Sequence, residues 1–93
     1  MELTIQYTGQ LASIAGTSEE MVPVAGDGRL KSLVDELAER HGRKYADLVF
    51  DADGRLHPSL LVIVDGDQID GDRAALDLDG VRTVMLMTPI AGG

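Results

Sequence analysis

The chain has 93 residues, of which 44% are hydrophobic, and its formal net charge is −8 from 16 acidic and 8 basic side chains. This length predicts a single domain, and the negative charge argues against nucleic acid as a ligand and favours a partner with a basic surface. The sequence contains no cysteine, which excludes disulfides, thiolate metal sites and cysteine nucleophiles. Because no long apolar run or signal peptide is recognisable, we expect a cytoplasmic protein without a membrane span.

The first predicted elements are two strands. Residues 1–7 alternate apolar and polar side chains, as a half-buried strand does. Residues 8–16 are expected to form a connection. Residues 17–24 indicate a second strand, and Pro23 restricts it to the edge of a sheet because proline lacks a backbone donor. The two strands are expected to pair as a hairpin.

The clearest helix follows the second strand. Apolar side chains recur at the spacing of one helical face, and His41 continues the stripe. This stripe consists of Leu30, Leu33, Val34, Leu37 and Ala38. Asp27 is the expected N-cap and Gly42 the expected C-terminal stop.

The second half of the chain predicts three more elements. Residues 60–64 are apolar on both faces, which is typical of a central strand. Asp65-Gly66 is a hairpin-type turn, with a short strand possible around residues 68–69. The last strand is predicted at residues 83–87, beside the first. The expected fold class is therefore α+β, a mixed sheet with one main helix packed on one face.

Several motifs that suggest chemistry fail on inspection. GDGRLKS lacks the glycine that a phosphate-binding loop needs before its lysine. DGDQIDGD lacks calcium ligands at two required positions, Ile69 and Leu76. His41 and His57 lack the spacing of paired metal ligands. We therefore expect no metal site and no enzyme activity of the chain's own.

The sequence ends MTPIAGG. Pro89 favours an extended backbone, and the residues after Ile90 have almost no side-chain bulk, so the segment is suited to a narrow channel. Adenylation by ATP turns a terminal carboxylate into an electrophile, and a sulfur or amine nucleophile can then take the acyl group. A frayed terminus accounts for the same residues equally well.

Four segments in order resemble one family: YTGQLASIAGTSEEMVPV, LKSLVDELAERHG, GRLHPSLLVIVDGDQI and PIAGG. They are similar to the ubiquitin-like sulfur carriers of the ThiS/MoaD type, and most to the small subunit of molybdopterin synthase. The resemblance implies a β-grasp domain at residues 1–88 and a flexible tail at residues 89–93. It also implies adenylation and thiocarboxylation of Gly93. The residues expected to guide the tail are Gly92, Ala91, Ile90 and Pro89.

The resemblance also implies partners. These are a ubiquitin-activating-type adenylyltransferase that uses ATP, a sulfur donor protein, and the larger molybdopterin synthase subunit or another sulfur acceptor. No permanently bound cofactor is implied. Three alternatives stay open: a carrier for cysteine, thiamine or tRNA thiolation pathways, a modifier conjugated to lysines through Gly93, and a binding domain with an idle tail.

The two central strands have apolar side chains on both sides. Valine and leucine specify a packed core, whereas methionine adapts to irregular binding surfaces. The expected inward residues are Val84, Leu86, Leu60, Val62 and Val64. The expected outward residues, which we interpret as a partner-binding patch near the root of the tail, are Met85, Met87, Leu61 and Ile63. The alternative is that residues 51–57 bury both sides.

Overall fold

A computed structural model of the chain describes residues 2–24 and 26–88. The predicted tail at residues 89–93 lies outside the described residues. Within the described part the elements are, in chain order, β1 (Glu2–Tyr7), α1 (Gly9–Ala15), β2 (Glu19–Pro23), α2 (Leu30–His41), α3 (Arg43–Val49), β3 (Leu61–Val64), β4 (Asp67–Gln68) and β5 (Thr83–Met87).

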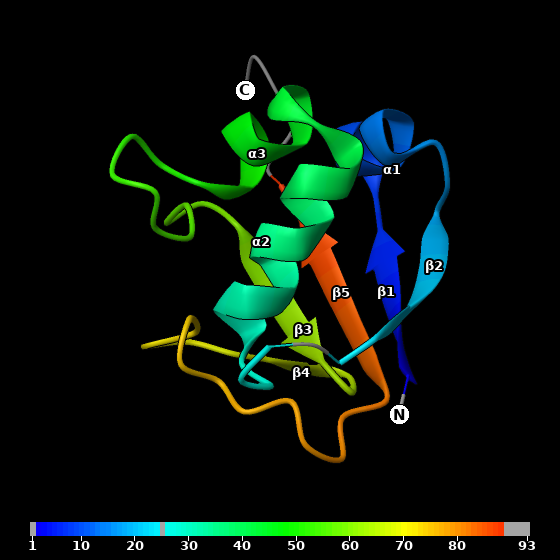
Figure 1. Cartoon of the computed structure of the whole chain (residues 1–93), viewed down its shortest axis with the longest axis vertical. Coiled ribbons are helices and arrows are strands. Elements are labelled where there is room, and N and C mark those ends of the chain that lie inside the picture. Colours follow the sequence, from blue (N-terminus) through cyan, green and yellow to red (C-terminus); the bar gives the residue numbers. More distant parts are fainter. Residues whose placement is uncertain (1, 25, 89–93) are drawn as a thin grey trace.

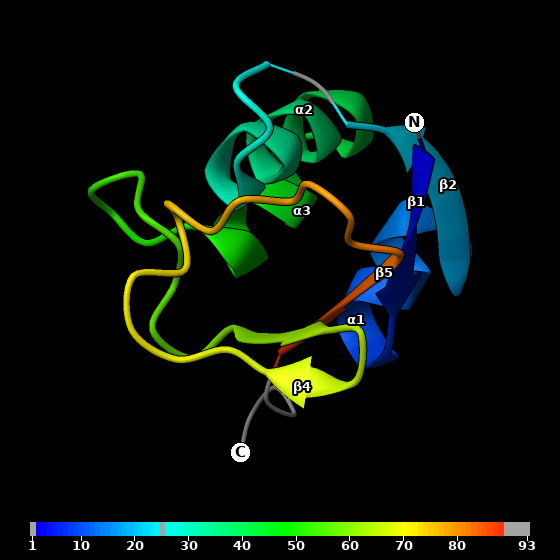
Figure 2. The ribbon, with the colours of Figure 1, turned by 90° about the horizontal axis from the view of Figure 1, so that it is seen from below.

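The strands form one mixed sheet in the order β2-β1-β5-β3-β4. β1 and β5 are parallel neighbours, and the other pairs are antiparallel. The long helix α2 lies across one face of the sheet (Figure 1), and the sheet curves around it (Figure 2). This is the predicted α+β arrangement, a ubiquitin-like β-grasp. The proline-containing strand β2 lies at the edge, as the sequence indicated.

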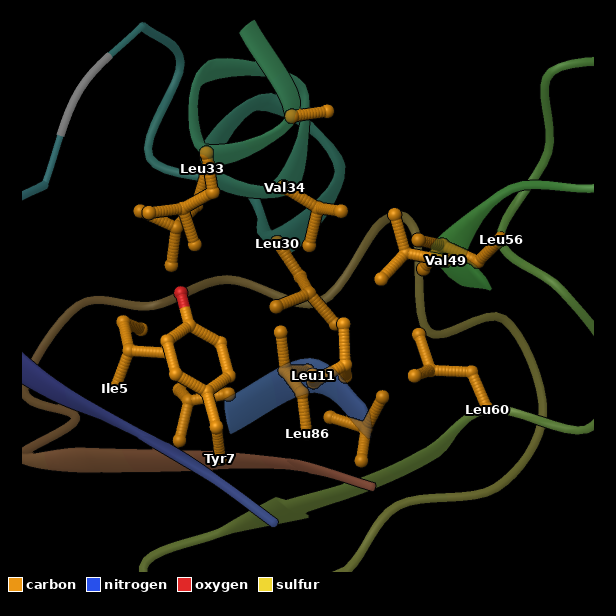
Figure 3. Close-up of a cluster of buried hydrophobic side chains, with 14 of the residues drawn as sticks. Ile5, Tyr7, Leu11, Leu30, Leu33, Val34, Val49, Leu56, Leu60 and Leu86 are labelled. Atoms are coloured by element: carbon orange, nitrogen blue, oxygen red, sulfur yellow. The ribbon is translucent and has the colours of Figure 1, made fainter. Parts of the chain in front are cut away.

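The core lies between the sheet and the helices. Leu3, Ile5 and Tyr7 of β1 are buried, so the predicted alternation of this strand is confirmed. They meet the apolar stripe of α2, whose five predicted members are also buried. Side chains from the helices and the strands point toward one another in this layer (Figure 3). Burial of apolar surface on this scale is the main driving force for folding.

The two ends of α2 differ in how well the sequence predicts them. Gly42 ends the helix as expected, with φ of 96° and its N–H donating to the Ala38 carbonyl. The prediction that Asp27 is the N-cap was wrong, because the helix begins at Leu30. Arg29 occupies the N-cap position, and its side chain makes no capping hydrogen bond. The Asp27 carboxylate accepts instead from the Arg29 N–H at 3.0 Å and from the Ser32 hydroxyl at 2.7 Å, and it closes the preceding turn.

Two short helices were not predicted. Residues 8–16 were expected to be a connection but contain α1, which buries Leu11, and residues 43–49 form α3, which buries Tyr45 and Val49. Each helix has seven residues. An isolated helix of that length is unstable in water, so tertiary packing stabilises both.

The chain reverses between β3 and β4 through the predicted turn. Asp65 and Gly66 both have positive φ, 49° and 90°, which is the geometry of a two-residue hairpin turn. The short strand after it, β4, begins one residue before the predicted position. β5 has the predicted bounds.

Candidate functional site

The candidate site is the sheet face opposite the helices. In the antiparallel register of β3 and β5, Leu61 lies opposite Met87 and Ile63 opposite Met85. Directly opposed residues on one face of a sheet lie in contact range. These four side chains therefore form one contiguous apolar surface, which we call the sheet patch.

The predicted orientation of the two strands is confirmed. Val84 and Leu86 are fully buried, as are Leu60 and Val62, whereas every member of the sheet patch is at least partly accessible. Leu61 is 39% exposed. The alternative prediction, that residues 51–57 bury both sides of the two central strands, is therefore wrong. Leu56 of that segment packs into the core instead. Partner binding by the sheet patch stays a prediction.

The sheet patch adjoins the segment from which the tail departs. Met87 is the last residue of β5, and Pro89 follows two positions later. A protein that binds this face would thus contact the chain immediately before the tail. The tail residues themselves, and the roles predicted for them, lie outside the described residues.

Acidic side chains flank the sheet patch. The register places Gln6 of β1 beside Met85 on one side and beside Glu19 of β2 on the other, and Glu19 is exposed. At the start of β5, the Asp65 carboxylate accepts from the backbone N–H of Thr83 at 2.9 Å. This bond, with further bonds from Arg82, lowers the pKa of Asp65. We call the Glu19 and Asp65 carboxylates the acidic rim; both can pair with basic groups on a partner.

A polar network lies on the helix side of the sheet and was missed by the sequence reasoning. Glu20 is its centre: its carboxylate accepts from the Tyr7 hydroxyl at 2.7 Å and from Arg40 at 3.1 Å, and lies 2.6 Å from His41 Nε2. Tyr45 extends it by donating to the Tyr7 hydroxyl at 3.1 Å. The network joins β1, β2, α2 and α3. The indication of this network in the sequence was that a polar residue, His41, continues the apolar stripe of the predicted helix.

The ionisation of this network follows from its contacts. Partial burial raises the pKa of Glu20, but the hydrogen bonds from Tyr7, His41 and Arg40 outweigh it, so the net pKa is lowered. Burial raises the pKa of both Tyr7 and Tyr45. At neutral pH the Glu20 carboxylate therefore accepts a bond from the neutral Tyr7 phenol, which itself accepts a bond from the neutral Tyr45 phenol. This arrangement holds strands and helices together and has no evident reactive group.

Residues 2–24 and 26–88 offer neither a metal site nor a membrane-spanning helix. No set of three histidine, cysteine or acidic side chains in these residues is arranged to hold a metal ion. None of their helices has both the length and the apolar character needed to cross a membrane.

Comparison with known proteins gives a family and a set of solved structures. The sequence model of the ThiS family matches residues 5–93. No curated protein matches the chain. SAMP1 from Haloferax volcanii is 26% identical, with both chains covered completely and a TM-score of 0.76. Urm1 from Trypanosoma brucei is 25% identical, with 99% of this chain and 95% of that chain covered and a TM-score of 0.73.

A third solved structure shows the same fold. It is a candidate molybdopterin converting factor, subunit 1, from Pyrococcus furiosus, and it is 23% identical. The alignment covers 97% of this chain and 99% of that chain, with a TM-score of 0.67. The three structures share the ubiquitin-like architecture described above, and their alignments cover 97–100% of this chain.

Proposed function

The chain belongs to the ThiS family, and we propose that it is a sulfur carrier whose Gly93 carboxylate is adenylated and converted to a thiocarboxylate. The family comprises ubiquitin-like sulfur carriers and modifiers, small proteins that are not enzymes themselves. The observation that carries the proposal is that the family match includes the tail, residues 89–93.

The proposed reaction has two steps. The Gly93 carboxylate attacks the α-phosphate of ATP in an activating enzyme, forming an acyl-adenylate and releasing pyrophosphate. Hydrosulfide supplied by a sulfur donor protein then attacks the acyl carbon and displaces AMP, which leaves a thiocarboxylate at Gly93. Because the sulfur is held on the main chain, the carrier needs no cysteine, and this chain has none.

The sheet patch is proposed to hold the chain on its partners during these steps. Its four side chains offer an apolar surface next to the root of the tail, and the acidic rim complements a basic partner. Docking there would leave residues 89–93 to reach into the partner's active site. The small size of Ala91, Gly92 and Gly93 suits that passage.

The acceptor pathway is a separate part of the proposal. We propose that the sulfur serves molybdopterin synthesis, with the larger synthase subunit as the acceptor enzyme, on the basis of the resemblance of the four sequence segments. Cysteine, thiamine or tRNA thiolation pathways are the alternatives. Adding the thiocarboxylated protein to each acceptor enzyme in turn, and measuring single-turnover sulfur transfer, distinguishes them.

The test of the carrier function is intact-mass spectrometry combined with tail variants. Protein isolated from its own cells should contain a species in which one oxygen is replaced by sulfur at Gly93. Deleting Gly93, or adding one residue after it, should abolish ATP–pyrophosphate exchange by the activating enzyme while the circular dichroism spectrum stays unchanged. Normal exchange with the extended variant would refute the proposal.

A second candidate function is protein modification. The observation that favours it is the 26% identity to SAMP1, since the Haloferax volcanii protein is described as a small archaeal modifier protein. The activated Gly93 would then form an isopeptide bond with target lysines. This function predicts a ladder of conjugates on a denaturing gel, which disappears when Gly93 is deleted. A carrier without modifier activity gives the sulfur-bearing free protein and no ladder.

A further inference from the structure

A cavity of about 420 Å³ lies between the start of α2 and two loops, residues 51–57 and 70–75. Its lining includes Lys31, Arg55 and Arg73 and one acidic residue, Asp72. The loops run along the same side of α2 (Figure 2). Three of the eight basic side chains of a strongly acidic protein thus meet at one cavity.

The structure holds two of these cations in place. The Lys31 ammonium lies 2.7 Å from the Asp35 carboxylate and 4.8 Å from the centre of the Phe50 ring. The guanidinium of Arg73 donates to the carbonyl of His57 at 3.0 Å and to the carbonyl of Leu60. Both cationic groups are therefore already oriented, which lowers the entropy cost of binding a ligand.

The charge of Arg73 is not balanced by a carboxylate. Among the ion pairs of residues 2–24 and 26–88, none within 4.0 Å involves Arg73 or Arg55. The acceptors of Arg73 are neutral carbonyls, and its side chain is partly buried. A partly buried cation without a counter-charge is unfavourable, and a bound anion would relieve that cost.

We propose that this cavity binds a small phosphate-bearing anion. A guanidinium has five N–H donors in a planar fork that fits phosphate oxygens. Arg73 donates to the carbonyls of Leu60 and His57, which leaves further N–H donors for a ligand. Arg55 is exposed and can close over a ligand, while Lys31 adds a point charge. The cavity shares no residue with the sheet patch, so this site is additional to the proposed sulfur-carrier function.

The experiment is an NMR titration of the full-length ¹⁵N-labelled protein with inorganic phosphate at constant ionic strength. We expect saturable amide shifts at residues 55–56 and 71–74. Arg55→Gln removes one cation whose side chain makes no hydrogen bond in the described structure, so the fold should persist. It should weaken binding about tenfold, the usual effect of losing a charge-assisted hydrogen bond.

The matched control is Arg43→Gln, which removes the same charge from a 91% exposed side chain on α3 outside the cavity. It should bind phosphate like the unaltered protein. Repeating the titration with AMP distinguishes two sources of the phosphate group. A site for a nucleotide phosphate binds AMP more tightly than inorganic phosphate, and a site for free phosphate does not. Absence of saturable shifts, or equal weakening by Arg55→Gln and Arg43→Gln, would overturn the proposal.

Discussion

The two faces of the sheet use the same central strands for different purposes. On the helix side β5 presents Val84 and Leu86, which are fully buried, and on the open side it presents Met85 and Met87, which are only partly covered. Branched side chains have few rotamers and pack uniquely, whereas methionine adapts its shape to a partner. The comparison teaches that one alternating strand can stabilise the fold with one set of side chains and offer a binding surface with the other.

The helices reinforce this asymmetry. α1, α2 and α3 each bury side chains in the single core, and the four members of the sheet patch are not part of it. A substitution on the helix side should therefore change stability, and the same substitution on the open side should change recognition. The predictions below test that division, starting with the largest effect.

The sharpest test compares aspartate at adjacent positions of β5. Val84→Asp places a carboxylate where the side chain is fully buried. An unpaired buried charge costs several kcal/mol, which is comparable with the roughly 5–15 kcal/mol that stabilise a small domain, so we expect loss of the folded state. Circular dichroism and dispersion of amide NMR signals would measure it.

On the open face, Met85→Asp and Ile63→Asp should remain folded but lose binding to the activating enzyme, as measured by isothermal titration calorimetry. Unfolding of these two variants, or binding unchanged from the unaltered protein, would break the comparison between the faces.

Truncation of leucines gives a smaller but quantitative contrast. Leu33→Ala and Leu37→Ala remove side chains of α2 that are 1% exposed, and each should lower the free energy of unfolding by about 2–5 kcal/mol. Leu61→Ala in the sheet patch should cost less than about 1 kcal/mol, because its side chain is already in contact with water. Urea denaturation measures both, and equal costs at Leu61 and Leu33 would contradict the face assignment.

The polar network predicts a pH dependence. The pKa of Glu20 in the folded state is below its ordinary value of 4.5, so its ionised form stabilises the protein above that pH, and the contribution is lost as the pH falls through the folded-state pKa. Glu20→Gln should lower stability at neutral pH by about 1–3 kcal/mol, because Tyr7, Arg40 and His41 lose a charged acceptor.

The difference in free energy of unfolding between Glu20→Gln and the unaltered protein should become smaller as the pH is lowered. Urea denaturation of both proteins between about pH 7 and about pH 3 measures this difference. A difference that stays constant over this range would show that the charge of Glu20 does not contribute.

The smallest effect is expected at the edge of the open face. Met21 in β2 is 63% exposed, so Met21→Ser should change the free energy of unfolding by no more than about 0.5 kcal/mol. Calorimetry with the activating enzyme shows whether this methionine belongs to the binding surface. Unaltered affinity would confine the surface to β3 and β5, and weaker binding would extend it across the sheet.

The sequence by itself determined the strands, the main helix and the faces they bury. In β1 the period-two alternation of apolar and polar side chains identifies the buried face, and in α2 the apolar stripe does so, because both periodicities follow from local backbone geometry. In β3 and β5, which are apolar on both faces, side-chain type and not alternation indicated the inward face. The same local chemistry identified Gly42 as a helix stop and Asp65-Gly66 as a turn. The composition of the sheet patch followed from the preference of valine and leucine for packed cores.

Only the tertiary structure decided the features that depend on distant residues. The helices α1 and α3 are too short to be stable alone, and packing of Leu11 and Tyr45 into the core stabilises them. Glu20 meets His41 across 21 positions of sequence, and Arg73 meets Leu60 across 13. No local pattern reports such contacts, because the energy that maintains them comes from residues that become neighbours only when the chain folds.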